Sequence, residues 1–287
     1  MLPPALVDAA LAGVFGLLIG SFLNVVIYRM PKIMERDWQA DYAEMQGTEL
    51  PPAEPFNLWV PRSRCQACGH QIRWYENIPV VSYLALRGKC SSCQTRISPR
   101  YPLIELAVGL LFAVCGWRWG ISLTAAAWAV FASILVAQFW IDFDTQYLPD
   151  DLNYLLLWLG LLVAAMGWTV PLPSAVWGAA LGYLSLWSVH HAFLLLTGKI
   201  GMGNGDFKLL AAICAWFGAD YLLAIIIMSS VVGSILGIIL LLVGKIAHKD
   251  IYMPFGPYLA GAGLLILVIG PAELRAMVPF IFPFAAR

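Results

Sequence analysis

The feature that most constrains this chain is a series of apolar runs, most of them close to the length that crosses a bilayer. A spanning helix needs roughly 20 predominantly apolar residues. Hydrophobic residues make up 61% of the chain and charged residues 12%, whereas about 25% of the residues in a soluble domain are charged. We therefore predict an all-α polytopic membrane protein with about eight transmembrane helices. The runs cover residues 6–28, 103–117, 121–141, 152–170, 174–197, 207–218, 221–244 and 257–283.

The distribution of positive charge predicts the orientation of these helices. Ten of the 17 Lys and Arg residues lie between Arg29 and Arg100, in a segment with no spanning run. Because positive loops stay in the cytoplasm, we expect this segment to be cytoplasmic and both termini to lie outside. Alternation then places the loops at 142–151, 198–206 and 245–256 on the cytoplasmic face.

Three parts of the chain follow from this topology. We predict a first transmembrane helix at 1–28, a cytoplasmic insert at 29–102, and a seven-helix membrane domain at 103–287. The formal net charge is zero, so charge gives no indication of a nucleic-acid partner. The expected surroundings are the lipid bilayer.

The insert contains two CxxC pairs, Cys65 with Cys68 and, after 21 further residues, Cys90 with Cys93. Four thiolates at this spacing match a tetrahedral zinc site in which each CxxC turn supplies two ligands. The alternatives are two disulfides or four unrelated cysteines, and a cytosolic location argues against disulfides. We therefore predict a structural Zn²⁺ site in the insert.

Two aspartates lie where predicted cytoplasmic loops meet apolar helices. Asp142 follows directly on the run "VAQFWI", and Asp206 follows two glycines, Gly203 and Gly205, in "GMGNGDFKLL". Two neighbouring carboxylates do not both ionise easily, so one keeps a proton and the other acts as a base. An aspartic protease needs this arrangement to activate water and to protonate the leaving amine.

The two glycines have a possible role in that chemistry. Glycine adopts backbone angles closed to other residues and lets another chain approach closely, which suits a substrate bound in extended form beside Asp206. Three further acids have an adequate structural explanation: Asp144, Asp150 and Asp151 can face water or start the next helix, where the helix dipole favours negative charge.

Several motifs in order resemble the type IV prepilin leader peptidases, bifunctional membrane enzymes of the GxGD aspartic protease class. The motifs are "GSFLNVVIYRMP", "NIPVVSYLALRGKCSSC", "SPRYPLIEL", "IDFDTQYLPD", "GMGNGDFKLL" and "PFGPYL". The resemblance covers nearly the whole chain and implies that Asp142 and Asp206 are the catalytic pair. Asp144 is the alternative for the first of them.

The resemblance also implies the substrates and the second activity. Such enzymes remove the basic leader of type IV prepilins and of type II secretion pseudopilins at the cytoplasmic face of the bacterial inner membrane. They then methylate the new N-terminal amine with S-adenosylmethionine, and the cysteine-bearing insert supports methylation. No GxGxxG dinucleotide-binding pattern joins a strand to a helix in this sequence, so the residues that hold the methyl donor stay unassigned.

Two alternatives remain open at this point. A peptidase-only homologue would share the aspartates without methylating its product. A zinc-binding membrane transporter would explain acids at helix ends, but it explains neither the GxGD loop nor the ordered set of motifs. The identity of the pilins and the oligomeric state cannot be predicted from the residues.

Overall fold

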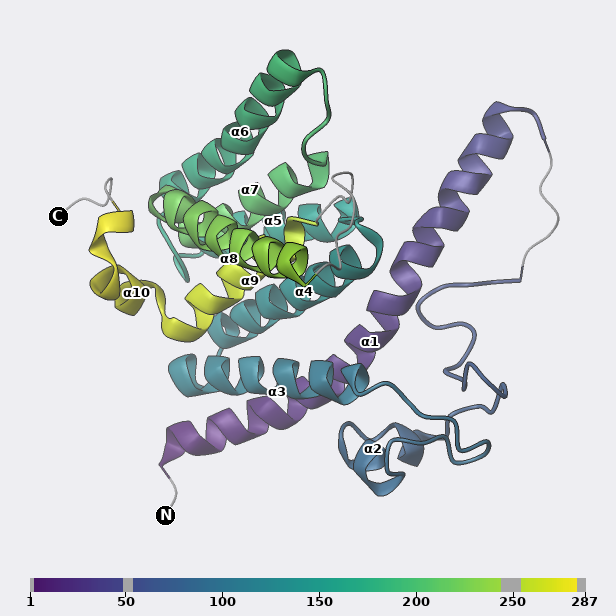
Figure 1. Cartoon of the computed structure of the whole chain (residues 1–287). Coiled ribbons are helices and arrows are strands. Elements are labelled where there is room, and N and C mark those ends of the chain that lie inside the picture. The colour runs from purple at the N-terminus through teal and green to yellow at the C-terminus, as the bar shows by residue number, and fades with distance from the viewer. Residues whose placement is uncertain (1–2, 49–53, 244–253, 283–287) are drawn as a thin grey trace. The chain divides into compact units, whose positions relative to one another are not determined.

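A computed structural model describes residues 3–48, 54–243 and 254–282 of the chain (Figure 1). Helices form every named element within these residues, accompanied by two isolated β-bridges. The elements are α1 (Pro4–Met45), η1 (Trp74–Asn77), α2 (Val81–Ala85), α3 (Arg100–Trp119), α4 (Leu123–Thr145), α5 (Asp150–Ala165), α6 (Leu172–Thr197), α7 (Asn204–Phe217), η2 (Ala219–Tyr221), α8 (Leu222–Leu242), α9 (Gly256–Ile269), α10 (Pro271–Met277) and η3 (Pro279–Ile281).

The all-helical prediction is confirmed for the described residues, but the predicted number of spans is not. Five helices there are long and apolar enough to cross a membrane, or six if the bent pair α9–α10 counts as one span. Two predicted spans, 152–170 and 207–218, correspond to α5 and α7, which have only 16 and 14 residues. The predicted loop at 245–256, with Lys245 and Lys249, falls mostly outside the described residues.

Two helix ends differ from the predicted runs for local reasons. The first helix does not end at residue 28 but continues through Pro31 to Met45, because the polar residues beyond the apolar run include strong helix formers such as Glu, Arg, Gln and Ala. The predicted run 257–283 breaks at Gly270, where φ is +104°, and Pro271 starts a new helix. The two helices meet there at 95°.

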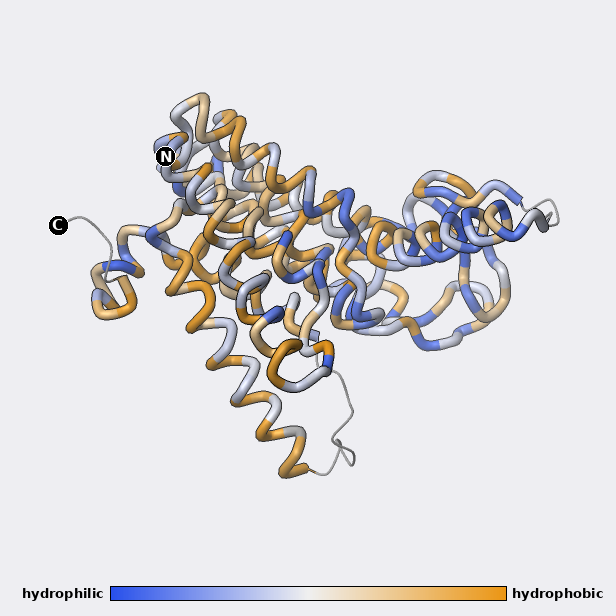
Figure 2. The backbone as a smooth tube through the Cα atoms, turned by 90° about the horizontal axis from the view of Figure 1, so that it is seen from above, coloured by the Kyte–Doolittle hydropathy of each residue, from blue (hydrophilic) through white to orange (hydrophobic). Residues whose placement is uncertain are grey.

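The chain divides into two compact units, Met1–Ser133 and Ile134–Arg287. This division falls inside α4, whereas we predict a functional boundary at 102/103. Figure 2 shows the difference in polarity along the chain: hydrophobic residues dominate the membrane helices, and hydrophilic residues are frequent in the later part of α1 and in the insert.

The first unit is built on the pairing of α1 with α3, which lie side by side in Figure 1. Glycines line this contact. A Cβ added at Gly16 would lie 2.6 Å from Phe112 Cβ, and one at Gly20 would lie 2.7 Å from Glu105 Cα. Small residues let helix backbones approach closely where lipid removes the hydrophobic driving force.

The insert is tied to both helices of this pair by buried polar side chains. Arg29 of α1 donates hydrogen bonds to the backbone carbonyls of Asn57 at 2.8 Å and Pro61 at 2.5 Å. Glu105 of α3 accepts a hydrogen bond of 2.7 Å from the backbone N–H of Val80, just before α2. These contacts hold the polar segment between α1 and α3 in a defined position within the first unit.

The second unit is organised around α7. All residues of α7 from Asp206 to Phe217 except Lys208 are buried, and the helix contacts α5, α6 and α9. Its single indole N–H, on Trp216, donates to the Leu156 carbonyl at 2.9 Å. With 14 residues, α7 is about 21 Å long, less than the roughly 30 Å of the hydrocarbon core. It is therefore an interior helix of this unit.

The glycine contact between α1 and α3 can be tested with one substitution at two positions. We expect Gly16→Ala to lower the stability of the detergent-solubilised protein by about 1–3 kcal/mol, the usual cost of overpacking. Gly13→Ala is the comparison and should cost less, because its Cβ would lie 3.3 Å from its nearest neighbours, against 2.6 Å at Gly16. Thermal unfolding of both variants measures the difference, and equal midpoints would contradict a close-packed contact at Gly16.

Candidate active site and metal centre

The second unit brings Asp142 and Asp206 together from two helices. Asp142 lies near the C-terminal end of α4 and Asp206 in the first turn of α7, and each residue is buried, with 5% and 7% of its surface exposed. The two carboxylates are close enough to interact electrostatically. The sequence predicts this pair, and the structure places both side chains in one buried site.

Backbone N–H groups lie near each carboxylate. Those of Gly256, at the first residue of α9, and of Gly203, which precedes α7, are close enough to stabilise a negative charge on Asp142 and Asp206 respectively, while Asp206 Oδ1 is buried without a hydrogen-bond partner among the described residues. The C-terminal end of α4 disfavours a negative charge, whereas the N-terminal ends of α7 and α9 favour one. Helix N-termini also have N–H groups without intrahelical partners, so these two can bind carboxylates without loss of helical hydrogen bonds.

Leu148 fills the space beside the pair. A Cβ at Gly205 would lie 2.7 Å from Leu148 Cβ, and one at Gly256 would lie 3.0 Å from Leu148 Cδ2 and 2.5 Å from Asp142 Oδ2. Glycine is therefore required at these two positions because neighbouring side chains occupy the place of a Cβ.

The structure gives a different reason for the GxGD glycines than the one we expected. Gly203 has an ordinary extended backbone, with φ of −79° and ψ of 152°, and Gly205 lies within helix α7. Neither position needs the conformational freedom of glycine. A Cβ at Gly203 would come no closer than 3.9 Å to Asp206 Oδ2, so steric demand falls on Gly205 and not on Gly203.

The other acids of the α4–α5 loop lie apart from the pair. Asp144 is exposed, and its position two residues after Asp142 turns it about 200° around the helix. Asp150 forms an ion pair of 2.6 Å with Lys208, and Asp151 lies exposed in the first turn of α5. Their surroundings match the structural roles expected for them.

Sequence reasoning missed a buried amide pair next to the aspartates. Gln138 is one helical turn before Asp142 on α4, so the two share a face. Its Nε2 donates to Asn153 Oδ1 at 2.9 Å and to the Pro149 carbonyl at 3.4 Å. These bonds fix the connection from α4 to α5, which carries Leu148. A glutamine inside the apolar run "FASILVAQFWI" was the available signal.

The four predicted cysteine ligands also meet, in the first unit. The Sγ atoms of Cys65, Cys68, Cys90 and Cys93 all lie within 4.8 Å of one another, and those of Cys65 and Cys93 are 3.8 Å apart. A tetrahedral ion with Zn–S bonds of about 2.3 Å separates its sulfur ligands by about 3.8 Å. The donor set and its spacing therefore fit a metal ion.

The two CxxC turns have the same local structure, offset by 25 residues. In the first, the N–H of Cys65 donates to the His70 carbonyl at 2.8 Å, and in the second the N–H of Cys90 donates to the Thr95 carbonyl at 2.9 Å. A β-bridge closes each turn, Arg64 with Gln71 and Lys89 with Arg96. We call these turns the first and second knuckles, residues 64–71 and 89–96.

Hydrogen bonding lowers the pKa of two cysteines of the cluster, Cys65 and Cys93. Hydrogen bonds to the side chain and backbone of Thr95 lower the pKa of the Cys93 thiol to about 6. The thiolate is the form that binds metals. Cys115 and Cys214, by contrast, are free cysteines buried in the apolar helices α3 and α7.

Comparison with known families divides the chain close to the boundary between its units. Residues 14–119 match the Bacterial Peptidase A24 N-terminal domain, and residues 128–238 match the Type IV leader peptidase family. The cysteine cluster lies within the first match, and Asp142 and Asp206 lie within the second. No solved structure matches the chain.

Curated relatives extend over nearly the full length. The chain is 53% identical to a "Prepilin leader peptidase/N-methyltransferase" of Stutzerimonas stutzeri, over 97% of this chain and 96% of the relative. Proteins of the same name from Pseudomonas putida and Neisseria gonorrhoeae are 51% and 48% identical, with 91% and 93% of this chain and 90% and 92% of the relatives covered. With its several apolar helices, the chain is a multi-pass membrane protein, and it belongs to the type IV leader peptidase family.

Proposed function

We propose that this protein removes the leader peptide of type IV prepilins and type II secretion pseudopilins and then N-methylates the new N-terminal residue. The observation that supports cleavage best is the burial of Asp142 and Asp206 within electrostatic reach of each other. The names of the relatives, which are similar over more than nine-tenths of this chain, support both activities.

In the proposed cleavage, the two aspartates share the proton transfers. Because they interact in a buried site, one carboxylate ionises more readily and the other keeps its proton. The ionised group removes a proton from water as the water oxygen attacks the scissile carbonyl carbon. The protonated group gives its proton to the leaving nitrogen as the C–N bond breaks. The products are a carboxyl group on the leader and a free amine on the pilin.

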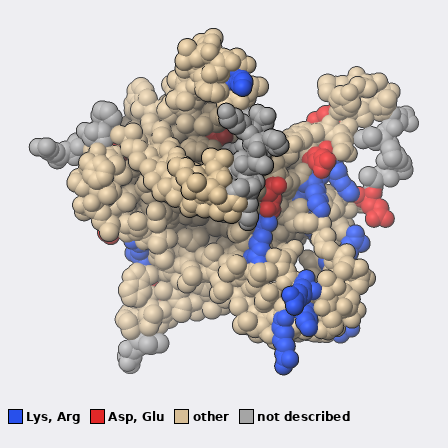
Figure 3. Space-filling model, in the orientation of Figure 1, with Lys and Arg blue, Asp and Glu red and all other residues tan. Residues whose placement is uncertain are grey.

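The location that we propose for this reaction is the cytoplasmic face of the bacterial inner membrane. Lys and Arg side chains gather over the insert and the adjoining part of α1 in Figure 3, and positive segments stay in the cytoplasm. A prepilin has a basic leader before a hydrophobic helix. Because the basic leader stays in the cytoplasm and the helix lies in the bilayer, the scissile bond between them lies at the cytoplasmic membrane surface, where we also place the insert.

The metal that we propose for the cysteine cluster is Zn²⁺, bound by Cys65, Cys68, Cys90 and Cys93. Four thiolates complete its tetrahedral shell and leave no open position, which is typical of a structural site. Its role is then to hold the two knuckles together within the insert.

The methyl donor that we propose is S-adenosylmethionine, which supplies an electrophilic methyl group. The neutral amine of the pilin attacks this group, the C–S bond breaks with its electron pair on sulfur, and the nitrogen releases a proton.

Substitution of each aspartate tests the cleavage site. Asp142→Asn and Asp206→Asn should each lower prepilin cleavage by about 100- to 10,000-fold, because Asn keeps the shape of Asp but cannot transfer the proton. Asp144→Asn, Asp150→Asn and Asp151→Asn should stay close to wild type. Cleavage is measured at equal membrane abundance. Normal cleavage by Asp206→Asn would exclude the aspartic-protease mechanism. Because methylation does not use these aspartates in our proposal, we expect Asp206→Asn to methylate a pilin that has already been cleaved.

The two glycines before Asp206 provide a matched pair of variants. Gly205→Ala should lower cleavage by about 100-fold, because a Cβ there displaces Leu148 or α7, and a shift of about 1 Å at a catalytic group has an effect of this size. Gly203→Ala should retain most activity, since its Cβ would make only an ordinary contact of 3.9 Å with Asp206 Oδ2. Equal loss in both variants would mean that the loop requires flexibility and not space.

Removal of the metal tests the second site. The Cys65→Ser, Cys68→Ser double variant should lose one metal ion per chain and most methylation, while cleavage decreases less, because the aspartates belong to the other unit. Ala67→Ser lies in the same knuckle, leaves all four thiols in place and should retain the metal. Metal analysis and the intact mass of the processed pilin are the measurements. A metal-free wild type with full methylation would refute this role.

A further inference from the structure

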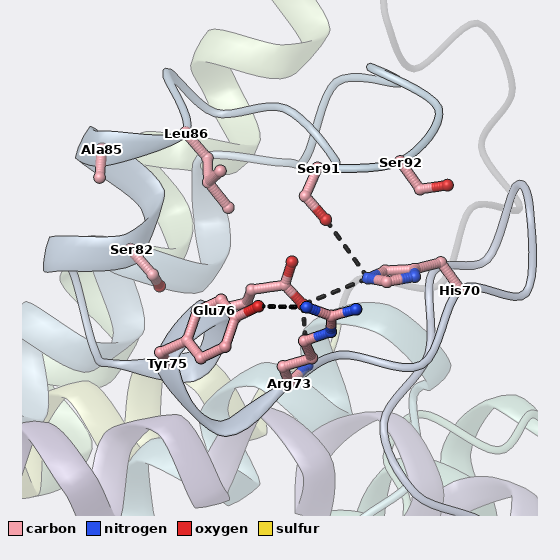
Figure 4. Close-up of a pocket in the computed structure, with 9 residues that line it drawn as sticks. All are labelled: His70, Arg73, Tyr75, Glu76, Ser82, Ala85, Leu86, Ser91 and Ser92. Carbon is pink, nitrogen blue, oxygen red and sulfur yellow. Dashed lines mark hydrogen bonds and ion pairs between the residues drawn. The ribbon is translucent and has the colours of Figure 1, made fainter.

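A cavity in the first unit has no role in the cleavage chemistry. Its volume is about 500 Å³, within the range of about 300–1,000 Å³ that is usual for small-molecule sites. Figure 4 shows that its walls come from four neighbouring segments: the first knuckle, the segment at η1, helix α2 with the residue after it, and the second knuckle. The lining residues are His70, Arg73, Tyr75, Glu76, Ser82, Ala85, Leu86, Ser91 and Ser92.

Glu76 is the anchored acid of this cavity. Its side chain is only 10% exposed, and its Oε2 accepts a hydrogen bond of 2.8 Å from the backbone N–H of Arg73 and lies 3.2 Å from His70 Nε2. Hydrogen bonding to Ser91 and then to Arg73 and His70 lowers the pKa of Glu76 to about 2. The cavity therefore contains a fixed negative charge at neutral pH, held by groups from both knuckles and η1.

The rest of the wall combines a cation, an aromatic ring and apolar atoms. The guanidinium of Arg73 donates a hydrogen bond of 2.6 Å to Tyr75 Oη, and both side chains line the cavity. Ala85 and Leu86 form an apolar part on the opposite side in Figure 4. A ligand that fits such a wall carries positive and negative charges, hydroxyl groups and a flat ring.

We propose that this cavity binds S-adenosylmethionine, with Glu76 as the acceptor for its positively charged part. The proposal rests on the methyltransferase activity proposed above. S-Adenosylmethionine has a sulfonium and an ammonium group, a carboxylate, a ribose with two hydroxyls and an adenine ring. The cavity offers a partner of suitable chemistry to each class of group: the Glu76 carboxylate, the Arg73 guanidinium, serine hydroxyls and the apolar wall.

The position of the cavity also connects the cysteine cluster with methylation. His70 is two residues after Cys68, and Ser91 and Ser92 lie between Cys90 and Cys93. A hydrogen bond of 3.3 Å between Ser91 Oγ and His70 Nε2 joins the two knuckles across the cavity. A metal bound by the four thiols would fix the separation of these knuckles, and thereby the shape of the wall, without contact with the methyl donor.

Direct binding to the purified full-length protein tests the proposal. Equilibrium binding of labelled S-adenosylmethionine is measured for wild type, Glu76→Gln and Ala85→Trp. Glu76→Gln removes the charge. Ala85→Trp fills the cavity from an exposed position on α2 and changes no polar contact of Glu76. Glu44→Gln, an equal charge change on the exposed end of α1, is the matched control. Prepilin cleavage by each variant and protease resistance of the insert report on folding.

We expect Glu76→Gln to weaken binding by about tenfold or more through loss of a charged hydrogen-bond partner, and Ala85→Trp to weaken it by occupying the space of the ligand. Cleavage should be unchanged in both variants, and Glu44→Gln should bind like wild type. Folded variants that bind S-adenosylmethionine normally would overturn the proposal. A variant in which only the KM for the cleaved pilin is higher would also overturn it, because the cavity would then bind the amine substrate. In both cases wild-type methylation leaves the proposed function standing. A wild type that cleaves but neither binds the donor nor methylates would contradict both.

Discussion

The burial of two carboxylates in one helical unit is the constraint on which the second half of this structure depends. A buried charge is costly unless polar groups replace its water, and at Asp142 and Asp206 these groups include backbone N–H groups from Gly256 and Gly203. Within a helix, such N–H groups are free only in the first turn. The start of α7 and the start of α9 must therefore both meet the end of α4, which fixes how three helices of this unit converge.

This convergence explains the small residues better than conformational freedom does. The backbone of α9 approaches the Asp142 carboxylate at Gly256, and the first turn of α7 packs on Leu148 at Gly205. Any side chain at these positions would separate the N–H donors or the helix from the groups that they contact. The same requirement for space appears in the first unit, where Gly16 and Gly20 let α1 approach α3.

Sequence patterns predicted the parts of the fold and site that depend on local information. Apolar runs located the membrane helices, the CxxC spacing located four thiols that do come together, and the loop–helix junctions indicated the aspartates. The predicted end of the first helix was wrong because hydropathy marks where a chain leaves the membrane, and not where a helix stops, so the polar extension of α1 to Met45 was missed. The break at Gly270 could have been read from the "GP" pair.

Contacts between distant segments could not be predicted in the same way. Leu148 is an unremarkable residue of a loop until α7 and α9 are placed against it, and Gln138 gains its role only when Asn153 of the next helix is opposite. The cavity beside Glu76 is likewise formed by four segments that no single motif joins. For such residues the sequence contains the composition of the site, but the partner of each group depends on the packed structure.

The residues proposed for cleavage and for methylation lie in different units, and the requirement for a free amine sets the order of the two reactions. The cleavage residues belong to Ile134–Arg287, whereas the cysteines and the cavity belong to Met1–Ser133. Each unit has a packed contact of its own, around α7 and between α1 and α3, so damage to one site need not destroy the other. Methylation nevertheless needs a free amine, and that amine does not exist until the peptide bond is broken. The two sites therefore belong to different units, while the second reaction still depends on the product of the first.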